Sequence, residues 1–233
     1  MKKVFLSLVV IFSAIFTLNA QTADEIIAKY ITAIGGAEKW SKIQSLIVEG
    51  QMEVQGIAIP FTMQGIHMKG NRVDAEFQGN KIIDITTPTK GWSQNPFGGK
   101  MALGPISDEE LKAKVDDLDL QDAFIDYKVK GSTVEFLGKD EEDGNEYYKI
   151  KITSKNNNDK TYFFDTKTYL AYKVESMTKQ QGQDVKSVIK LLDYQTIDFG
   201  IKMSFKSDMG QMMMVTKKVT VNPTIDETIF KVN

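Results

Sequence analysis

The sequence predicts an α+β fold that is mainly β, built on one long antiparallel sheet with a single apolar face. From Ser45 onward apolar and polar residues alternate with a period of two, and residues 201–206 alternate Ile, Met and Phe with Lys, Ser and Lys. Turn signals such as Asp198, Phe199, Gly200 separate these short runs. Such a sheet must cover its apolar face with helices, a second sheet or a bound hydrophobic molecule.

The N-terminal residues have the pattern of a secretory signal peptide. Lys2 and Lys3 precede an apolar run from Val4 to Leu18, and Ala20 supplies a small residue at the expected cleavage point. The run is shorter than the roughly 20 apolar residues that a membrane-spanning helix needs. We therefore expect a signal peptide over residues 1–20 cleaved after Ala20, export to the periplasm, and one domain over residues 21–233.

Composition argues against several classes of function. The chain has 29 basic and 31 acidic residues and a formal net charge of -2, with the charges interspersed along the sequence. So mild a charge does not predict binding to nucleic acid or to an anionic membrane surface. The chain has no cysteine, so we expect no disulfides and no lipid attached to a cysteine. The length suits one β-rich domain with an ample core, and we expect a monomer.

The first helix begins after Thr22, which forms a capping box with Glu25. Its apolar residues recur at three- and four-residue spacing from Ile26 to Ile34, and the glycine pair at 35–36 supplies the stop. A second short helix is predicted over residues 37–43. It carries Trp40, which we interpret first as a core anchor, because large aromatic residues are usually buried where helices meet sheets.

Strands follow from Ser45. Before the middle of the chain the predicted strands are residues 46–54, 57–63, 73–77, 82–87 and 90–94, with hairpin signals at Gln55–Gly56, Gly70–Asn71 and Gly79–Asn80. The Gly- and Pro-rich residues 95–105 are predicted to be a long loop. Together with the meander after residue 133, the sequence predicts about 11 or 12 strands.

A second capping box, Ser107 with Glu110, begins a helix that interrupts the strands. Leu111, Val115 and Leu118 are predicted to lie on its inner side. This helix is placed to lie across the apolar face of the sheet as a lid. It is equally well placed to be a fixed packing helix, and the sequence does not separate these two alternatives.

The chain offers few residues for catalysis or metal binding. His67 is the only histidine and is predicted to lie on a strand, packed or facing solvent, so no multi-histidine metal site can form. The acidic runs at 116–119 and 141–143 are typical of solvated surface. Residues 98–100 lack the strand-to-helix spacing of a phosphate loop. We therefore expect no enzymatic activity, no catalytic residue, no metal and no cofactor.

Methionine is frequent on the predicted apolar faces. The chain has 11 methionines, and residues 209–214 contain four of them. Methionine is flexible and polarizable, so it can line a pocket that fits acyl chains of varying shape. It can also fill an irregular core, and both interpretations remain open, although the methionines as a set favour an adaptable cavity.

Four segments resemble a known family of envelope proteins. They are ADEIIAKYITAIGGAEKWSKIQSL, YFFDTKTYLAYKVES, DYQTIDFGIKMSF and VNPTIDETIFKV. In these segments the chain resembles the outer-membrane lipoprotein-sorting proteins related to the periplasmic carrier LolA, over essentially all of residues 21–233. The resemblance implies an unclosed, strongly bent antiparallel half-barrel whose concave apolar face is covered by helices, with space for lipid chains between them.

The resemblance also implies a function and its partners. A carrier of this kind takes the acyl chains of a lipoprotein from an inner-membrane transporter, shields them across the periplasm and passes them to an outer-membrane receptor. The family's carriers use a cavity arginine to control the lid. Arg72 is the only arginine of this chain, and its neighbours Asp74 and Glu76 predict an exposed ion pair instead, so we do not assign that role to it.

We therefore predict a soluble periplasmic carrier that binds lipid or lipoprotein acyl chains in the half-barrel. The alternative is a non-catalytic structural or regulatory envelope protein with the same fold, a filled core and an active surface. A cavity of several hundred cubic ångströms would separate the two hypotheses. A hydrolase that uses Glu49 or Asp74 is a third and more distant hypothesis. The predicted lining of the cavity is Trp40, Phe61, Met63, Trp92, Leu111, Val115, Phe163, Met203 and Phe205.

Overall fold

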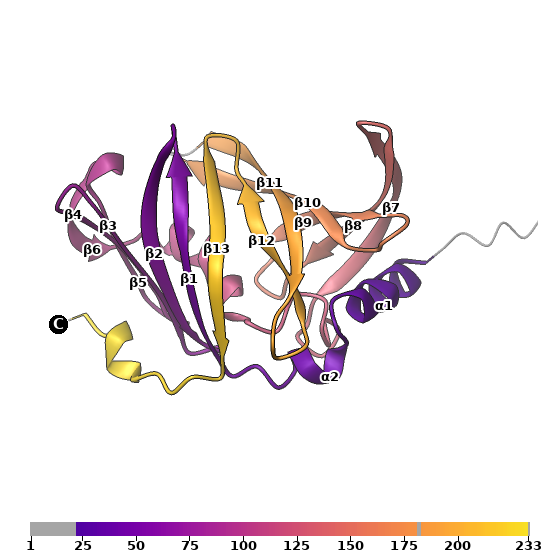
Figure 1. Ribbon diagram of the computed structural model, residues 1–233, viewed down its shortest axis with the longest axis horizontal. Coiled ribbons are helices and arrows are strands. Elements are labelled where there is room, and N and C mark those ends of the chain that lie inside the picture. The colour runs from indigo at the N-terminus through magenta and orange to yellow at the C-terminus, as the bar shows by residue number, and fades with distance from the viewer. Residues whose placement is uncertain (1–21, 181–182, 233) are drawn as a thin grey trace, which may run out of the picture.

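The computed structural model describes residues 22–180 and 183–232 (Figure 1). The predicted signal peptide, residues 1–20, lies outside the described residues. One antiparallel sheet of 13 strands forms the body of the protein. The strands in chain order are β1 (Ser45–Val54), β2 (Ile57–Ile66), β3 (Gly70–Phe77), β4 (Asn80–Thr86), β5 (Gly91–Asn95), β6 (Lys100–Pro105), β7 (Thr133–Glu142), β8 (Asn145–Thr153), β9 (Asp159–Asp165), β10 (Ala171–Gln180), β11 (Gln183–Thr196), β12 (Lys202–Asp208) and β13 (Met212–Val221).

The spatial order of the strands is β6-β5-β4-β3-β2-β1-β13-β12-β11-β10-β9-β8-β7. The first and last strands are therefore neighbours in the middle of the sheet, and β6 and β7 are its two edges. The ladder between β12 and β13 has only three register pairs, and Figure 1 shows these two strands diverging below it. The sheet is strongly bent and does not close, which confirms the predicted mainly β half-barrel.

The count of 13 strands exceeds the predicted 11 or 12 partly because residues 95–105 are not a loop. They form the end of β5, a 3-10 turn η1 (Pro96–Gly98) and β6. The Asn95 side chain accepts a hydrogen bond from Gly98 N at 3.2 Å, and Gly99 takes a positive φ of 83°. The Gly and Pro residues therefore make a tight hairpin turn.

The hairpin signal at Gly70–Asn71 was also misplaced, because the turn occupies residues 67–69 and both residues belong to β3. Met68 takes the positive φ, at 58°. Gly70 is needed for a different reason: a Cβ there would lie 2.6 Å from the ring of Phe230. Phe230 ends the 3-10 turn η3 (Glu227–Phe230), so the C-terminal segment packs against the beginning of β3.

The N-terminal helices agree with their sequence signals. Helix α1 (Ala23–Ala33) has the predicted capping box, with Thr22 and Glu25 bonded reciprocally. Helix α2 (Ala37–Trp40) is shorter than the predicted 37–43. The Trp40 indole Nε1 donates to the Ile34 carbonyl oxygen at 3.0 Å, and this bond ties the end of α2 to the end of α1.

The helix in the middle of the chain is short. Helix α3 (Asp108–Lys114) begins at the predicted Ser107 capping box, and a 3-10 turn η2 (Val115–Leu118) follows it. The chain then runs without regular structure to β7. Figure 1 shows α3 and η2 lying behind β1 and β13, inside the curve of the sheet. We call residues 106–132, which connect β6 to β7, the crossing segment.

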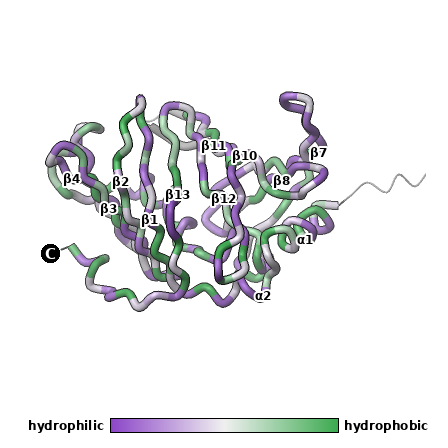
Figure 2. Tube along the Cα trace, in the orientation of Figure 1, coloured by the Kyte–Doolittle hydropathy of each residue, from purple (hydrophilic) through white to green (hydrophobic). Residues whose placement is uncertain are grey.

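The main core lies between α1, the second half of the crossing segment and one face of the sheet. Alternation along the strands gives that face its apolar character (Figure 2). Tyr30 of α1 contacts the rings of Phe124 and Phe164, with centroids 5.7 and 4.9 Å apart. A smaller cluster of Ile59, Phe61 and Ala75 lies on β2 and β3. No helix among the described residues is long and apolar enough to cross a membrane.

Gly50 provides a test of this packing. It sits at an irregularity in the β1–β13 register, where a Cβ would meet the Val215 carbonyl oxygen and lie 2.8 Å from the Phe61 ring. We expect Gly50→Ala to lower the free energy of unfolding by about 1–3 kcal/mol, because neither neighbour has room to move. Gly104→Ala is the matched control, since the nearest atom to its Cβ is 4.0 Å away. Urea unfolding measures both, and equal effects would contradict the packing described.

Candidate ligand-binding site

The candidate site is a cavity of about 530 Å³ between the crossing segment, the β8–β9 turn and the β2–β3 turn. One part of its wall is apolar, formed by one residue from each of five strands, turns or helices: Met68, Pro88, Val115, Ile152 and Tyr162. The rest is polar or charged. A cavity of this size is in the range that holds a small molecule.

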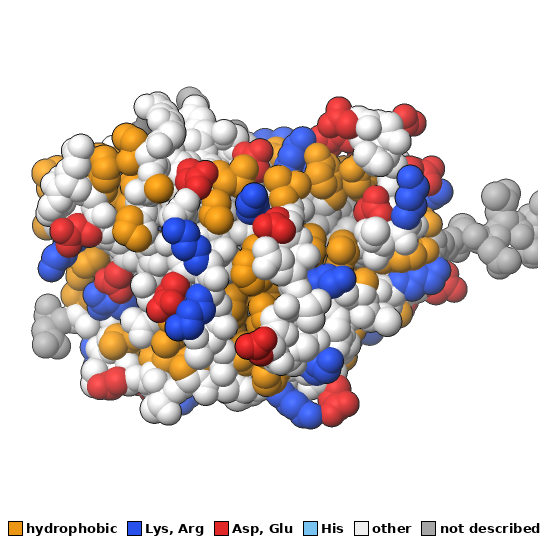
Figure 3. All heavy atoms as spheres, in the orientation of Figure 1, with side chains coloured by type: hydrophobic (Ala, Val, Ile, Leu, Met, Phe, Trp, Pro, Cys, Tyr) orange, Lys and Arg blue, Asp and Glu red, His pale blue; other side chains and the backbone are white. Residues whose placement is uncertain are grey.

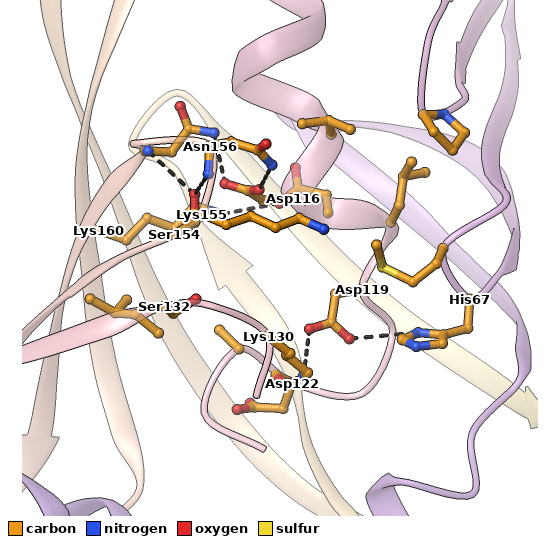
Figure 4. A pocket seen from close by; sticks show the side chains of 18 of the residues that line it. His67, Asp116, Asp119, Asp122, Lys130, Ser132, Ser154, Lys155, Asn156 and Lys160 are labelled. Atoms are coloured by element: carbon orange, nitrogen blue, oxygen red, sulfur yellow. Dashed lines mark hydrogen bonds and ion pairs between the residues drawn. The ribbon is translucent and has the colours of Figure 1, made fainter. Parts of the chain in front are cut away.

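The β8–β9 turn holds the crossing segment on one side of the cavity. The Asp116 carboxylate accepts a hydrogen bond from Asn156 Nδ2 at 2.6 Å and another from Asn158 Nδ2 at 2.7 Å (Figure 4). Asn158 also donates to the Lys112 carbonyl oxygen at 2.8 Å. Lys160 of β9 pairs with Asp117 at 3.0 Å. The turn therefore clamps the junction of α3 and η2.

The other wall of the half-barrel holds α3 from the opposite side. Lys114 of α3 forms an ion pair with Asp84 of β4. Glu110 of α3 pairs with Lys100 of β6 at 3.1 Å. Each of these pairs is partly exposed and contributes about 0–1 kcal/mol by itself. Because all of them act on one short helix, they fix its position across the concave face.

His67, Asp119 and Lys130 form a connected group in the cavity wall. Asp119 lies between the other two, with Oδ1 3.6 Å from His67 Nδ1 and Oδ2 2.5 Å from Lys130 Nζ (Figure 4). The Leu120 backbone N–H donates to His67 Nδ1 at 3.2 Å, so Nδ1 is an acceptor and His67 is neutral. Burial lowers the pKa of His67, and this effect outweighs the attraction of Asp119 for the imidazolium.

Asp122 links the cavity to the core. Its Oδ2 accepts a hydrogen bond from the Tyr30 hydroxyl at 2.6 Å, and its Oδ1 accepts one from the Phe124 N–H at 2.9 Å. Burial raises the pKa of Asp122 despite these two donors. The Asp122 carboxylate therefore holds α1 and the buried part of the crossing segment together.

The charges around the cavity are mostly paired with one another. Lys130 and Lys160 are engaged by Asp119 and Asp117. Lys155 also lines the cavity and forms no hydrogen bond or ion pair with any described residue. The cavity therefore offers an apolar wall, neutralised polar groups and one ammonium group available to a ligand.

The predicted lining residues lie in different parts of the structure. Val115 lines the cavity. Leu111 is half-buried on α3, one turn before it. Phe61 and Met63 of β2 and Met203 and Phe205 of β12 share the face of the sheet that packs on the core clusters, as their strand register shows. Trp40 is buried in the main core at 6% exposure. Of the nine predicted residues, the structure brings only Val115 into the lining of this cavity.

Trp92 and Phe163 are not brought together with the other residues, because they lie on the opposite face of the sheet. Phe163 is covered by two ammonium groups, with Lys173 Nζ 4.1 Å and Lys149 Nζ 5.4 Å from its ring centroid. Trp92 pairs with Ile85 of β4. The next residue, Asp84, forms an ion pair with Lys114 of α3, so Ile85 and Trp92 point to the opposite face. Alternation shows that a strand has two faces but not which one is concave.

Arg72 shares that outer face. It binds Asp74 through two hydrogen bonds of 2.7 Å, which agrees with the predicted ion pair, although both side chains are partly buried. Its Nη1 also donates to the Ile229 carbonyl oxygen at 2.9 Å. Arg72 therefore anchors the C-terminal segment.

Sequence reasoning missed most of the cavity's polar wall. His67 was predicted to lie on a strand, but it is in the β2–β3 turn and faces the crossing segment. Asn156 and Asn158 belong to a polar turn that has the composition of any solvated turn. The acidic run 116–119 was interpreted as solvated surface, whereas three of its residues make the contacts above. No group of three or more His, Asp or Glu side chains in the described part of the chain is placed to hold a metal ion.

No protein-family model and no curated protein sequence matches the chain. Several solved structures do. A LolA superfamily protein from Nitrosomonas europaea is 11% identical, with a TM-score of 0.57 over 91% of this chain and 99% of that one. A DUF1329 family protein from Desulfovibrio piger is 13% identical, with a TM-score of 0.54 over 88% and 97%. A domain from Vibrio parahaemolyticus described as an outer membrane lipoprotein-sorting protein domain is 13% identical, with a TM-score of 0.52 over 88% and 94%.

These comparisons define the class of fold. The chain has the open half-barrel of the LolA-like and lipoprotein-sorting proteins, which confirms the resemblance found in the sequence. At such low identity the likeness shows the fold alone, and it carries no residue from those proteins to this one.

His67 gives a testable pH dependence. Because its folded-state pKa lies below the usual value of about 6.5, the unfolded chain takes up this proton first as the pH falls. The stabilisation from neutral His67 is therefore complete above about pH 6.5 and is lost as the pH falls through the folded-state pKa. His67→Asn keeps an acceptor for the Leu120 N–H and does not titrate. We expect it to lose less stability than the wild type between about pH 7 and pH 5 in urea unfolding. Equal losses would show that His67 does not contribute.

Proposed function

We propose that this protein is a periplasmic carrier that binds the acyl chains of a lipid or lipoprotein on the concave side of the half-barrel. The observation that carries the proposal is the cavity of about 530 Å³ beneath the crossing segment, which has both an apolar wall and polar lining residues. A structural protein with a filled core needs no such space. The fold shared with lipoprotein-sorting proteins supports the same conclusion.

The chemistry of the wall suits an amphipathic ligand. Met68, Val115 and Ile152 offer apolar contact, and burial of each ligand CH₂ group contributes about 0.8 kcal/mol. Lys155 is available to an anionic or polar group at the end of the chain. A site that covers only part of an acyl chain binds it and can still release it, as a carrier must.

The proposed relay has an inner-membrane transporter as donor and an outer-membrane receptor as acceptor. It requires export of the chain, which the N-terminal residues predict. The protein would act as a monomer, without a cofactor and without catalysis.

Filling the cavity tests the proposal. Val115→Trp would displace at least two methylene groups of a bound chain, which costs about 1.6 kcal/mol, or more than tenfold in Kd. We expect that loss in the uptake of a fluorescent fatty acid, and a matching loss of co-purified lipid in native mass spectrometry. Val129→Trp is the matched control, because Val129 is 87% exposed and lies outside the cavity.

Two results would contradict the proposal. Equal loss of uptake in both variants would place the ligand elsewhere. A folded wild-type protein that carries no lipid and takes up no fatty acid would favour the filled-core alternative, a structural or regulatory protein that acts through its surface.

A further inference from the structure

Most of the large apolar side chains that are exposed among the described residues lie on three hairpins. Ile57 begins β2 directly after the β1–β2 turn, and Phe97 and Met101 flank the β5–β6 turn. Met177 and Val188 lie on the β10–β11 hairpin. Their exposed fractions run from 36% for Val188 to 70% for Met101. Single exposed apolar residues are ordinary, but their grouping on three hairpins is not.

These hairpins end on one side of the molecule. Turns in an antiparallel meander alternate between the two ends of the strands, so the β1–β2, β3–β4 and β5–β6 turns share one end. Figure 1 shows them along the top and upper left, with the β12–β13 turn beside them and the β10–β11 hairpin behind. Figure 3 shows hydrophobic side chains at the upper left of the molecule, with others scattered over the same face. We call Ile57, Phe97, Met101, Met177 and Val188 the apolar rim.

The apolar rim is continuous with the inner wall of the half-barrel. The Phe97 ring lies 5.7 Å from the ring of Phe77, centroid to centroid. Phe77 packs in turn against the cluster of Ile59, Phe61 and Ala75 on β2 and β3. An acyl chain that enters at the rim would therefore meet apolar surface from the hairpin tips to the concave face.

Charges near the rim are paired within the protein. Lys100 pairs with Glu110 at 3.1 Å, and Lys186 pairs with Glu175 at 3.0 Å. Each of these two pairs is neutral as a whole, so in this proposal the rim attracts a surface through apolar contact rather than through these charges.

We propose that the apolar rim is the surface by which this protein docks onto a lipid bilayer, with the ends of the β1–β2 and β5–β6 hairpins inserted among the lipid head groups. The inference rests on the proposed function, because the bilayer is then the donor or acceptor of the acyl chain. A bilayer fits these residues better than a protein partner does. The side chains are spread over three separate hairpins, with Phe97 in a turn and the other four in strands. A stable protein interface instead needs a contiguous surface of about 1,000 Å² or more.

The backbone of the β5–β6 turn is also suited to insertion. Gln94 Nε2 donates to the Met101 carbonyl oxygen at 3.0 Å, and the Asn95 side chain binds Gly98 N. These bonds satisfy polar groups of the β5–β6 turn that would otherwise lose their water on entering the head-group layer.

A site-specific reporter tests the docking. Phe97→Trp and Val129→Trp both place an indole at an exposed apolar position, but Val129 lies on the crossing segment and not on the rim. With the exported protein and phosphatidylcholine vesicles, we expect the emission of Phe97→Trp to shift to the blue and to be quenched by brominated lipid. The emission of Val129→Trp should not change. Equal quenching of both, or of neither, would overturn the proposal.

Vesicle flotation gives a second measurement. The double variant Phe97→Ser, Met101→Ser should bind vesicles about tenfold or more weakly, because two large side chains no longer insert. Leu137→Ser, at 43% exposure on the edge strand β7, is the matched control and should bind as the wild type does. Binding should change less than about threefold between 0.05 M and 0.5 M salt, because no net charge drives it. A larger loss with salt, or an equal loss in the control, would overturn the proposal.

The failure of docking can be told apart from the failure of the proposed function. Rim variants should take up a fluorescent fatty acid from solution as the wild type does, since the cavity is unchanged. If they lose uptake as well, the rim belongs to the ligand site and the docking proposal is wrong. If the wild type binds vesicles through Phe97 but takes up no fatty acid, docking stands and the carrier function fails.

Discussion

The connection between the two edges of the sheet is the constraint on which the rest of the structure depends. The chain enters the sheet in the middle at β1, reaches one edge at β6, and must then cross to β7 at the other edge before it returns to β13. A flat sheet of 13 strands would be roughly 60 Å wide, at about 4.8 Å per strand. Bending brings the edges toward one another, so residues 106–132 can cross on the concave side and cover the apolar face as they do so.

The crossing segment has two parts that are held by different forces. Helix α3 buries no residue and is held by ion pairs and amide hydrogen bonds from both walls. The part that follows is packed into the core, where Leu118, Phe124 and Ile125 are almost fully buried. The first stretch thus covers the concave face and the second packs into the core, while the role of the helix as a lid stays a prediction. The cavity lies where the first changes into the second.

Much of the fold could be predicted from local patterns, because local contacts produce it. The capping boxes at Thr22 and Ser107 work within one turn of helix, and both are present. The site depends on long-range contacts that no local pattern encodes. Phe163 alternates as a core residue does, yet lysines of the neighbouring strands cover it on the outer face. Gly70 was taken for a turn because the approach of Phe230, from the far end of the chain, leaves no trace near residue 70.

The pairing of charges around the cavity bears on how a carrier can both bind and release. If its lysines and aspartates were unpaired, a ligand of opposite charge would be held by a force that only another charge could overcome. In the proposed carrier Lys130 and Lys160 already have carboxylate partners, so apart from the contact that Lys155 offers, apolar burial would supply most of the affinity. Apolar affinity grows with the number of buried methylene groups and does not depend on the identity of the acceptor. If the proposed carrier function holds, a bilayer or a receptor that buries more of the chain than the cavity does would therefore take it without another source of energy.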